Sequence, residues 1–214
     1  MGNVTAWVAE KLTKDERQLK VVDLTPEGFL VIESTDDYTF LVAVLGVKDV
    51  VQVSHVQPLF GAENKPELVV NVPSKTLWSG PAIDFVHSVP AAFGTMGDIA
   101  RAAATKAAGS FRDKNMGFFI NAMAQHTNVS AVSYLYDSVF RVDRRSGASL
   151  TVAVIDAYNM SAEDVRNARA RVGHFDIVVK SSSYGSITAQ AEAAAGSIGA
   201  QALTFGDLMQ RLSR

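Results

Sequence analysis

Residues 150–214 constrain the fold more than any other part of the chain, because three apolar runs alternate there with segments of helical pattern. The apolar runs are Leu150–Ile155, Phe175–Val179 and Gln201–Phe205. The helical segments begin at Ser161, cover 186–196 and begin again at Asp207. Strands that are apolar along their whole length are typical of parallel sheets with helices on both faces. This segment therefore predicts α/β architecture.

The first 60 residues show a different pattern. A helix is expected over 3–15, and apolar runs follow at 19–24, 29–34 and 38–47. Only short polar segments separate these runs, and short connections are typical of antiparallel hairpins. A fourth run at 50–56 partly alternates between apolar and polar residues. We predict a helix followed by a small antiparallel β-meander.

Gly61–Pro66 is polar, contains Gly and Pro, and separates the two patterns. Beyond it we expect a strand at 67–72, helices at 80–89, 96–108 and 111–125, and two strands within 129–144. The predicted fold is a mostly parallel Rossmann-like sheet with flanking helices, preceded by the helix and meander. The predicted regions are 1–60 and 61–214, or one continuous domain, and no internal repeat is evident.

Composition excludes several classes of protein. With 48% hydrophobic and 20% charged residues, the chain can bury a sizeable core, so long disorder is not expected. Its net charge of −2 gives no general attraction to nucleic acid or anionic membranes. The absence of cysteine excludes disulfides and thiolate chemistry. Without an apolar run of membrane length or a secretory pattern, we expect a soluble cytoplasmic protein that has no membrane partner.

Candidate site residues lie in loops that follow predicted strands, where parallel sheets usually bind ligands. One such loop follows the strand at 175–179, a second follows 67–72, and a third is Asp156–Met160. The predicted ligand-binding residues are Lys180, Ser181, Ser183, Tyr184, Ser186 and Thr188 from the first loop, with Lys75 and Trp78 from the second.

The residue types in these loops suit an anion. Amides at a helix N-terminus attract negative charge, Gly185 permits close backbone approach, and lysine supplies a positive charge. Neither loop contains the Walker or dinucleotide glycine pattern, so the alternative is a polar turn and helix cap. The first hypothesis is thus a soluble anion-binding protein whose ligand is a phosphate-bearing small molecule or nucleic acid. The sequence indicates no cofactor, and it specifies neither catalytic residues nor enzymatic activity.

A second hypothesis is a non-catalytic structural or assembly protein. The apolar helix at 111–125 and the edge of the meander would then make contacts in a homo-oligomer. The four histidines include no His-x-His and no pair four residues apart, so no zinc site is predicted.

The order of helix, meander and following helices resembles the layout of restriction-endonuclease-like nucleases. That family places an acidic residue and an acidic-x-Lys triplet on adjacent strands. Asp36-Asp37 and the segment 71–75 do not match this motif, and Asp176 and Lys180 lie on one strand, about 13 Å apart at ~3.3 Å per residue. The resemblance therefore implies, as a third hypothesis, an inactive or divergent nuclease domain.

Overall fold

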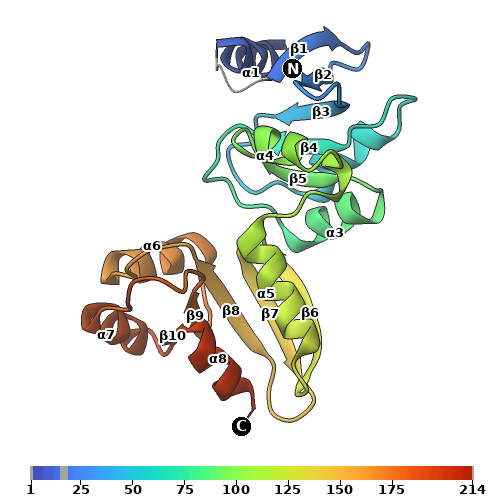
Figure 1. The fold of residues 1–214 in the computed structure, drawn as a ribbon. Helices are drawn as coiled ribbons and strands as arrows, with labels where there is room; N and C mark the ends of the chain where they lie inside the picture. The colour runs from blue at the N-terminus through green and yellow to red at the C-terminus, as the bar shows by residue number, and fades with distance from the viewer. Residues whose placement is uncertain (1, 15–18, 214) are drawn as a thin grey trace. The chain divides into compact units, whose positions relative to one another are not determined.

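The structure is a computed structural model that describes residues 2–14 and 19–213 (Figure 1). The chain divides into two compact units, Met1–Asp113 and Lys114–Arg214. The polar segment 61–66 lies inside the first unit, between the short helix η1 and strand β4. The change of sequence pattern at this point is thus internal to one sheet-forming unit.

The first unit contains a five-stranded sheet in the order β1-β2-β3-β4-β5. Its elements are α1 (Gly2–Lys14), β1 (Leu19–Leu24), β2 (Leu30–Ser34), β3 (Thr39–Leu45), α2 (Val53–Val56), η1 (Gln57–Phe60), β4 (Leu68–Asn71), α3 (Gly80–Ser88), β5 (Ala92–Thr95), α4 (Asp98–Ala104) and η2 (Ala108–Ser110). β1, β2 and β3 pair antiparallel, whereas β3, β4 and β5 pair parallel.

The second unit contains a five-stranded sheet in the order β10-β9-β8-β7-β6. Its elements are α5 (Lys114–Gln125), β6 (Val129–Tyr136), β7 (Val139–Arg144), β8 (Leu150–Ile155), α6 (Ala162–Val172), β9 (Ile177–Lys180), α7 (Ala189–Ser197), β10 (Gln201–Thr204) and α8 (Phe205–Leu212). β6, β7 and β8 pair antiparallel, and β8, β9 and β10 pair parallel as the apolar runs of 150–214 predicted.

The predicted fold class is wrong, because the chain forms two mixed sheets rather than one mostly parallel Rossmann-like sheet. The N-terminal meander is not a separate small sheet, since β3 pairs with β4 and so continues into the parallel strands. The run at 50–56 is not a strand either. Val51 makes one isolated bridge and α2 begins at Val53, so the partial alternation does not reflect a sheet face.

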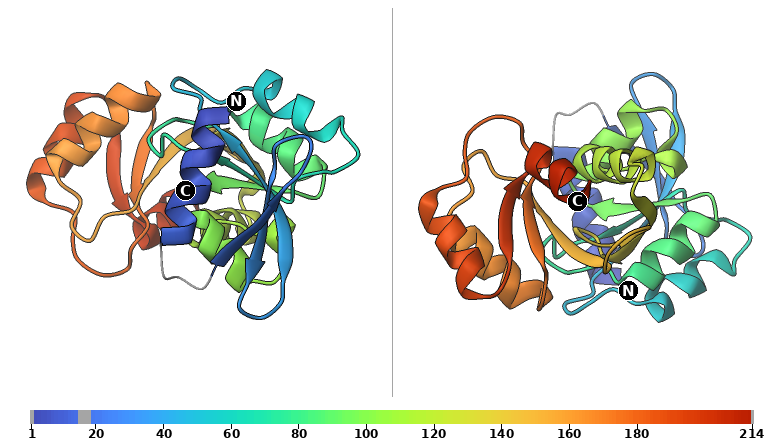
Figure 2. Two further views of the ribbon diagram at one scale, coloured as in Figure 1. Left: turned by 90° about the horizontal axis from the view of Figure 1, so that it is seen from above. Right: turned by 90° about the horizontal axis from the view of Figure 1, so that it is seen from below.

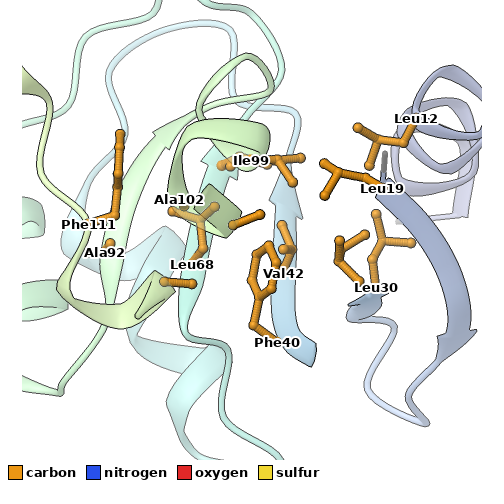
Figure 3. Close-up of a cluster of buried hydrophobic side chains, with 14 of the residues drawn as sticks. Leu12, Leu19, Leu30, Phe40, Val42, Leu68, Ala92, Ile99, Ala102 and Phe111 are labelled. Carbon is orange, nitrogen blue, oxygen red and sulfur yellow. The ribbon is translucent and has the colours of Figure 1, made fainter. Parts of the chain in front are cut away.

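Each sheet has helices on its faces. In the first unit, Leu12 of α1 and Ile99 and Ala102 of α4 pack on the strand residues Val42 and Leu68, as Figure 3 shows. In the second unit, α5 and α8 pack against one face, and α6 and α7 cover the other (Figure 2). The core residues on these faces include Met123 and Leu208 on one side and Val165 and Ala191 on the other.

The two units repeat one topology. In both, a helix precedes three antiparallel strands. Two parallel strands follow, each preceded by a helical segment, and a helix follows the last strand. Buried residues recur at equivalent places: Leu12 of α1 matches Met123 of α5, and Ile99 of α4 matches Leu208 of α8. The expectation that the chain has no internal repeat is therefore wrong.

Individual hydrogen bonds recur as well, and the residue numbers of equivalent partners differ by 109 or 110 between the units. Val51 N donates to Leu77 O at 2.8 Å, and Met160 N donates to Ser186 O at 2.9 Å. The carboxylate before β4, Glu67, accepts from Leu41 N at 3.3 Å. Its counterpart before β9, Asp176, accepts from Thr151 N at 2.7 Å. The second unit can thus be compared residue by residue with the first.

Candidate functional site

The predicted loop at 181–188 connects β9 to α7 in the second unit. Thr188 is the N-cap of α7, because its Oγ1 accepts a hydrogen bond from Ala191 N at 3.2 Å. Thr188 N and Oγ1 also donate to Met160 O at 3.1 Å each. Thr188 is therefore occupied by a cap and by the neighbouring loop.

This loop lies against the loop that follows β8, as expected for the carboxyl ends of neighbouring parallel strands. Asn159 Oδ1 accepts hydrogen bonds from Ser186 N at 2.9 Å and from Ser186 Oγ at 3.3 Å. Ser181 Oγ donates to Asp156 Oδ1 at 3.1 Å. Two of the three loops singled out in the sequence thus form one surface.

Gly185 makes the closest backbone approach between these two loops. It has a φ of +74°, and a Cβ atom there would lie 1.9 Å from Tyr158 O. Only glycine adopts this conformation readily and leaves room for the carbonyl. Gly185 is therefore required for the loops to meet.

Lys180 does not project into solvent, although it is the lysine on which the anion hypothesis rested. Its side chain is buried, and the residue is only 2% exposed. Its ammonium donates to the carbonyl oxygens of Ser182 and Tyr184. Among the described residues, no carboxylate lies within 4.0 Å of Nζ. Lys180 thus holds the loop from beneath.

The two carbonyls fixed by Lys180 determine where the adjoining amides point. Every peptide bond in the described chain is trans, so the N–H of each peptide points opposite to its carbonyl. The amides of Ser183 and Gly185 therefore face away from Lys180, toward solvent, where both residues are exposed. Neither amide has an acceptor among the described residues. The amide of Tyr184 between them donates to Ser182 Oγ at 3.1 Å, so two alternate amides are left as donors for an anion.

The corresponding loop of the first unit is closed. Asn71 occupies the place of Lys180 at the end of β4, and its side chain bonds to Val47 N and O at 2.9 and 3.0 Å. Thr76, which corresponds to Gly185, donates its N–H to Pro73 O at 2.9 Å. In the second unit the equivalent acceptor, Ser182 O, binds Lys180, just as Pro73 O also accepts from Asn71 Nδ2 at 3.4 Å. The difference is that the amide of Gly185, among the described residues, lacks the internal hydrogen bond that the amide of Thr76 makes.

Lys75 and Trp78 belong to this closed loop of the first unit. Lys75 is exposed, but Trp78 is only 3% exposed and packs on Phe93 with 5.1 Å between ring centroids. Trp78 therefore offers no exposed ring for stacking. The two predicted sets of residues lie on different sheets, since β4 belongs to the first sheet and β9 to the second. The sequence pattern did not reveal this separation.

Two exposed tyrosines lie beside the amides of Ser183 and Gly185. Tyr184 lies within the loop and is 74% exposed, and Tyr158, on the facing loop, is 69% exposed. They are the most exposed of the large hydrophobic side chains in the described residues. Tyr158 and Asn159 were not among the predicted site residues. The signal was available in the order of elements, since Asp156–Met160 follows the strand adjacent to Lys180.

The other candidate residues, those for a metal site and for acid–base catalysis, do not come together in the described residues. No group of three or more His, Cys, Asp or Glu in the described ranges could hold a metal ion. Asp176 and Lys180 stand at opposite ends of β9, and Asp176 bonds to Thr151 N and His174. His126 joins the end of α5 to α8 through Met209 O at 3.2 Å. Its contacts match the role of a helix C-terminal partner.

His87 of α3 has the largest pKa shift given a value in the described chain. Burial, together with a smaller contribution from the positive charge of Arg112, lowers the pKa of His87 from 6.5 to about 4. The folded state therefore favours neutral imidazole, and the unfolded state binds more protons between pH 6.5 and 4. This contribution to stability is fully present above pH 6.5 and is lost as pH falls through 4.

We expect the first unit to lose about 1–2 kcal/mol over this range, because partial exposure of the ring screens the full effect. The variant His87→Phe should show a smaller loss between pH 6.5 and 4. Both tryptophans lie in the first unit, so fluorescence-detected urea denaturation at several pH values measures it. Equal pH dependence in the two proteins would contradict the assignment.

No family model, curated protein or solved structure matches this chain. Among the helices of the described ranges, none is both long enough and apolar enough to cross a membrane.

Proposed function

We propose that the second unit binds an oxyanion of the phosphate type at the loop Ser181–Ser186, which we call the anion loop. The observation that carries this proposal is one hydrogen bond that the second unit lacks. Thr76 N donates to Pro73 O in the first unit, whereas the amide of Gly185 has no acceptor among the described residues and Ser182 O binds Lys180.

Electrostatics support the same ligand. A buried ammonium without a carboxylate partner is costly, and a bound anion above it would offset that cost. Hydrogen bonds from Lys180 also polarise the two peptides, which strengthens their amides as donors. A tetrahedral oxyanion has several acceptor oxygens and can take both amides together with the exposed Ser183 hydroxyl.

Removing the ammonium tests this proposal. In Lys180→Met, a side chain of similar length fills the same apolar space, but the two carbonyls are released. We expect inorganic phosphate to bind at least about tenfold more weakly, because both the charge and the fixed amides are lost. Isothermal titration calorimetry of the full chain gives the affinity, and Lys65→Ala, at an exposed lysine of the first unit, is the control for general charge.

A second measurement does not depend on the variant folding. Phosphate added to the wild-type chain should shift the amide resonances of Ser183 and Gly185 more than those of Lys75 and Thr76. Unshifted amides at both positions under saturating phosphate would overturn the proposal. Equal binding by wild type and a folded Lys180→Met would do the same.

The other two hypotheses have less support. Assembly through α5 would use Phe118, which is 55% exposed, but its ring already packs on Phe205 at 4.9 Å between centroids. A nuclease of this family would need an acidic-x-Lys triplet on a strand. None of the strands in the described residues contains one.

A further inference from the structure

The two most exposed tyrosines of the described chain lie beside the anion loop. Tyr184 is part of it, and Tyr158 belongs to the facing loop whose carbonyl adjoins Gly185. Neither ring is needed for the core, and neither makes a ring contact among the described residues. Exposed apolar surface that gathers at one place is characteristic of binding sites.

The backbone that carries these tyrosines is held in place. Asn159 clamps Ser186, Met160 pairs with Ile187, and Lys180 fixes the carbonyls on either side of Ser183. Tyrosine has few rotatable bonds, so binding on a fixed backbone costs little conformational entropy. The surface is therefore suited to bind a flat ring without rearrangement.

From this juxtaposition we infer that the ligand is a nucleoside phosphate, either free or as an unpaired nucleotide of a single strand. This inference rests on the proposed function, since the phosphate occupies the amides of Ser183 and Gly185. The base stacks on Tyr184 or Tyr158, because aromatic side chains bind the face of any base. A base inside a duplex has no free face, so paired nucleic acid is disfavoured.

The first unit lacks this combination at the equivalent loop. Lys75 stands where the second unit has Tyr184, and Pro73 stands where it has Ser182. The aromatic Trp78 is buried, and the turn amide of Thr76 is bonded. Nucleotide binding is therefore assigned to the second unit alone.

The test compares the binding of four probes by calorimetry: inorganic phosphate, adenosine monophosphate, a single-stranded adenine oligonucleotide, and the same oligonucleotide in a duplex. We expect adenosine monophosphate to bind roughly tenfold or more tightly than inorganic phosphate. The single strand should bind more tightly than the duplex. If the single strand binds more tightly than adenosine monophosphate, the ligand is a nucleotide within a strand. If it does not, the ligand is a free nucleotide.

In the double variant Tyr158→Leu/Tyr184→Leu, the ratio of the affinity for adenosine monophosphate to the affinity for inorganic phosphate should fall to about one. The double variant Tyr158→Phe/Tyr184→Phe, which keeps both rings, should retain the wild-type ratio. If nucleotides bind no more tightly than phosphate, or if the leucine variant keeps the preference, the inference is overturned while the proposed function stands. If wild type binds none of the probes, the proposed function itself fails.

Discussion

Gly185→Ala should destabilise the second unit by about 2–4 kcal/mol and abolish phosphate binding. A residue other than glycine costs roughly 1–2 kcal/mol at positive φ, and here the added methyl also meets Tyr158 O at 1.9 Å. The backbone must move to relieve this contact, which separates the anion loop from the loop after β8. Hydrogen exchange of segments 150–205 measures the change, because both tryptophans lie in the first unit.

Gly173→Ala is the matched control. Gly173 ends α6 with a φ of +79°, but a Cβ atom there would meet nothing within 4 Å. This variant should cost only the conformational part, about 1–2 kcal/mol, and should bind phosphate as the wild type does. If the two variants behave alike, the close approach of Gly185 to Tyr158 does not determine the site.

Truncation of equivalent core residues should have an even larger effect on stability. Ile99→Ala in α4 and Leu208→Ala in α8 each remove a fully buried side chain that packs a helix onto its own sheet. Each should cost about 2–5 kcal/mol, because the lost contacts leave a cavity. Since each unit has its own core cluster, the loss of hydrogen-exchange protection should concentrate in the unit that carries the substitution.

Gln210→Ala is the control for the second of these variants, since Gln210 lies exposed on the same helix. It should change stability by less than about 0.5 kcal/mol. Equal loss of protection in both units after Ile99→Ala would contradict the view that each unit has an independent core.

Local patterns in the sequence predicted most elements but not their partners. The runs at 19–24, 29–34 and 150–155 are strands, and the two strands expected within 129–144 are β6 and β7. What failed was the assignment of strands to sheets. An apolar strand such as β4 has the same sequence pattern whether it pairs with β3 or with a strand of another sheet. The pattern indicates which residues are buried but not which strands are paired.

The repeat escaped detection for a related reason. A buried position accepts several apolar residues of similar size, so Leu12 can correspond to Met123 without sequence identity. The clearest shared residues are Thr95, Gly97 and Asp98, which correspond to Thr204, Gly206 and Asp207. In both units the threonine hydroxyl donates to the aspartate in the first turn of the last helix. Such a short match is visible only once the elements are aligned.

The position of the loop after β9 was predicted, but the orientation of Lys180 within it was not. Strand ends in a parallel arrangement indicated the loop at 181–188, and its lysine, serines and tyrosine are there. The direction of the Lys180 side chain depends on the alternation of β9, whose four residues are all buried on both faces. A strand buried on both faces gives no sequence signal for which side chains reach solvent.

The repetition of one topology within a single chain separates two demands that usually compete. A loop that leaves amides unbonded and buries a charge without a carboxylate partner weakens the fold that carries it. Asn71 and Thr76 bond within the loop of the first unit, whereas the amide of Gly185 in the second has no acceptor among the described residues. Under the proposed function, one copy of the topology carries the anion loop, and the stability cost of that loop falls on half of the chain.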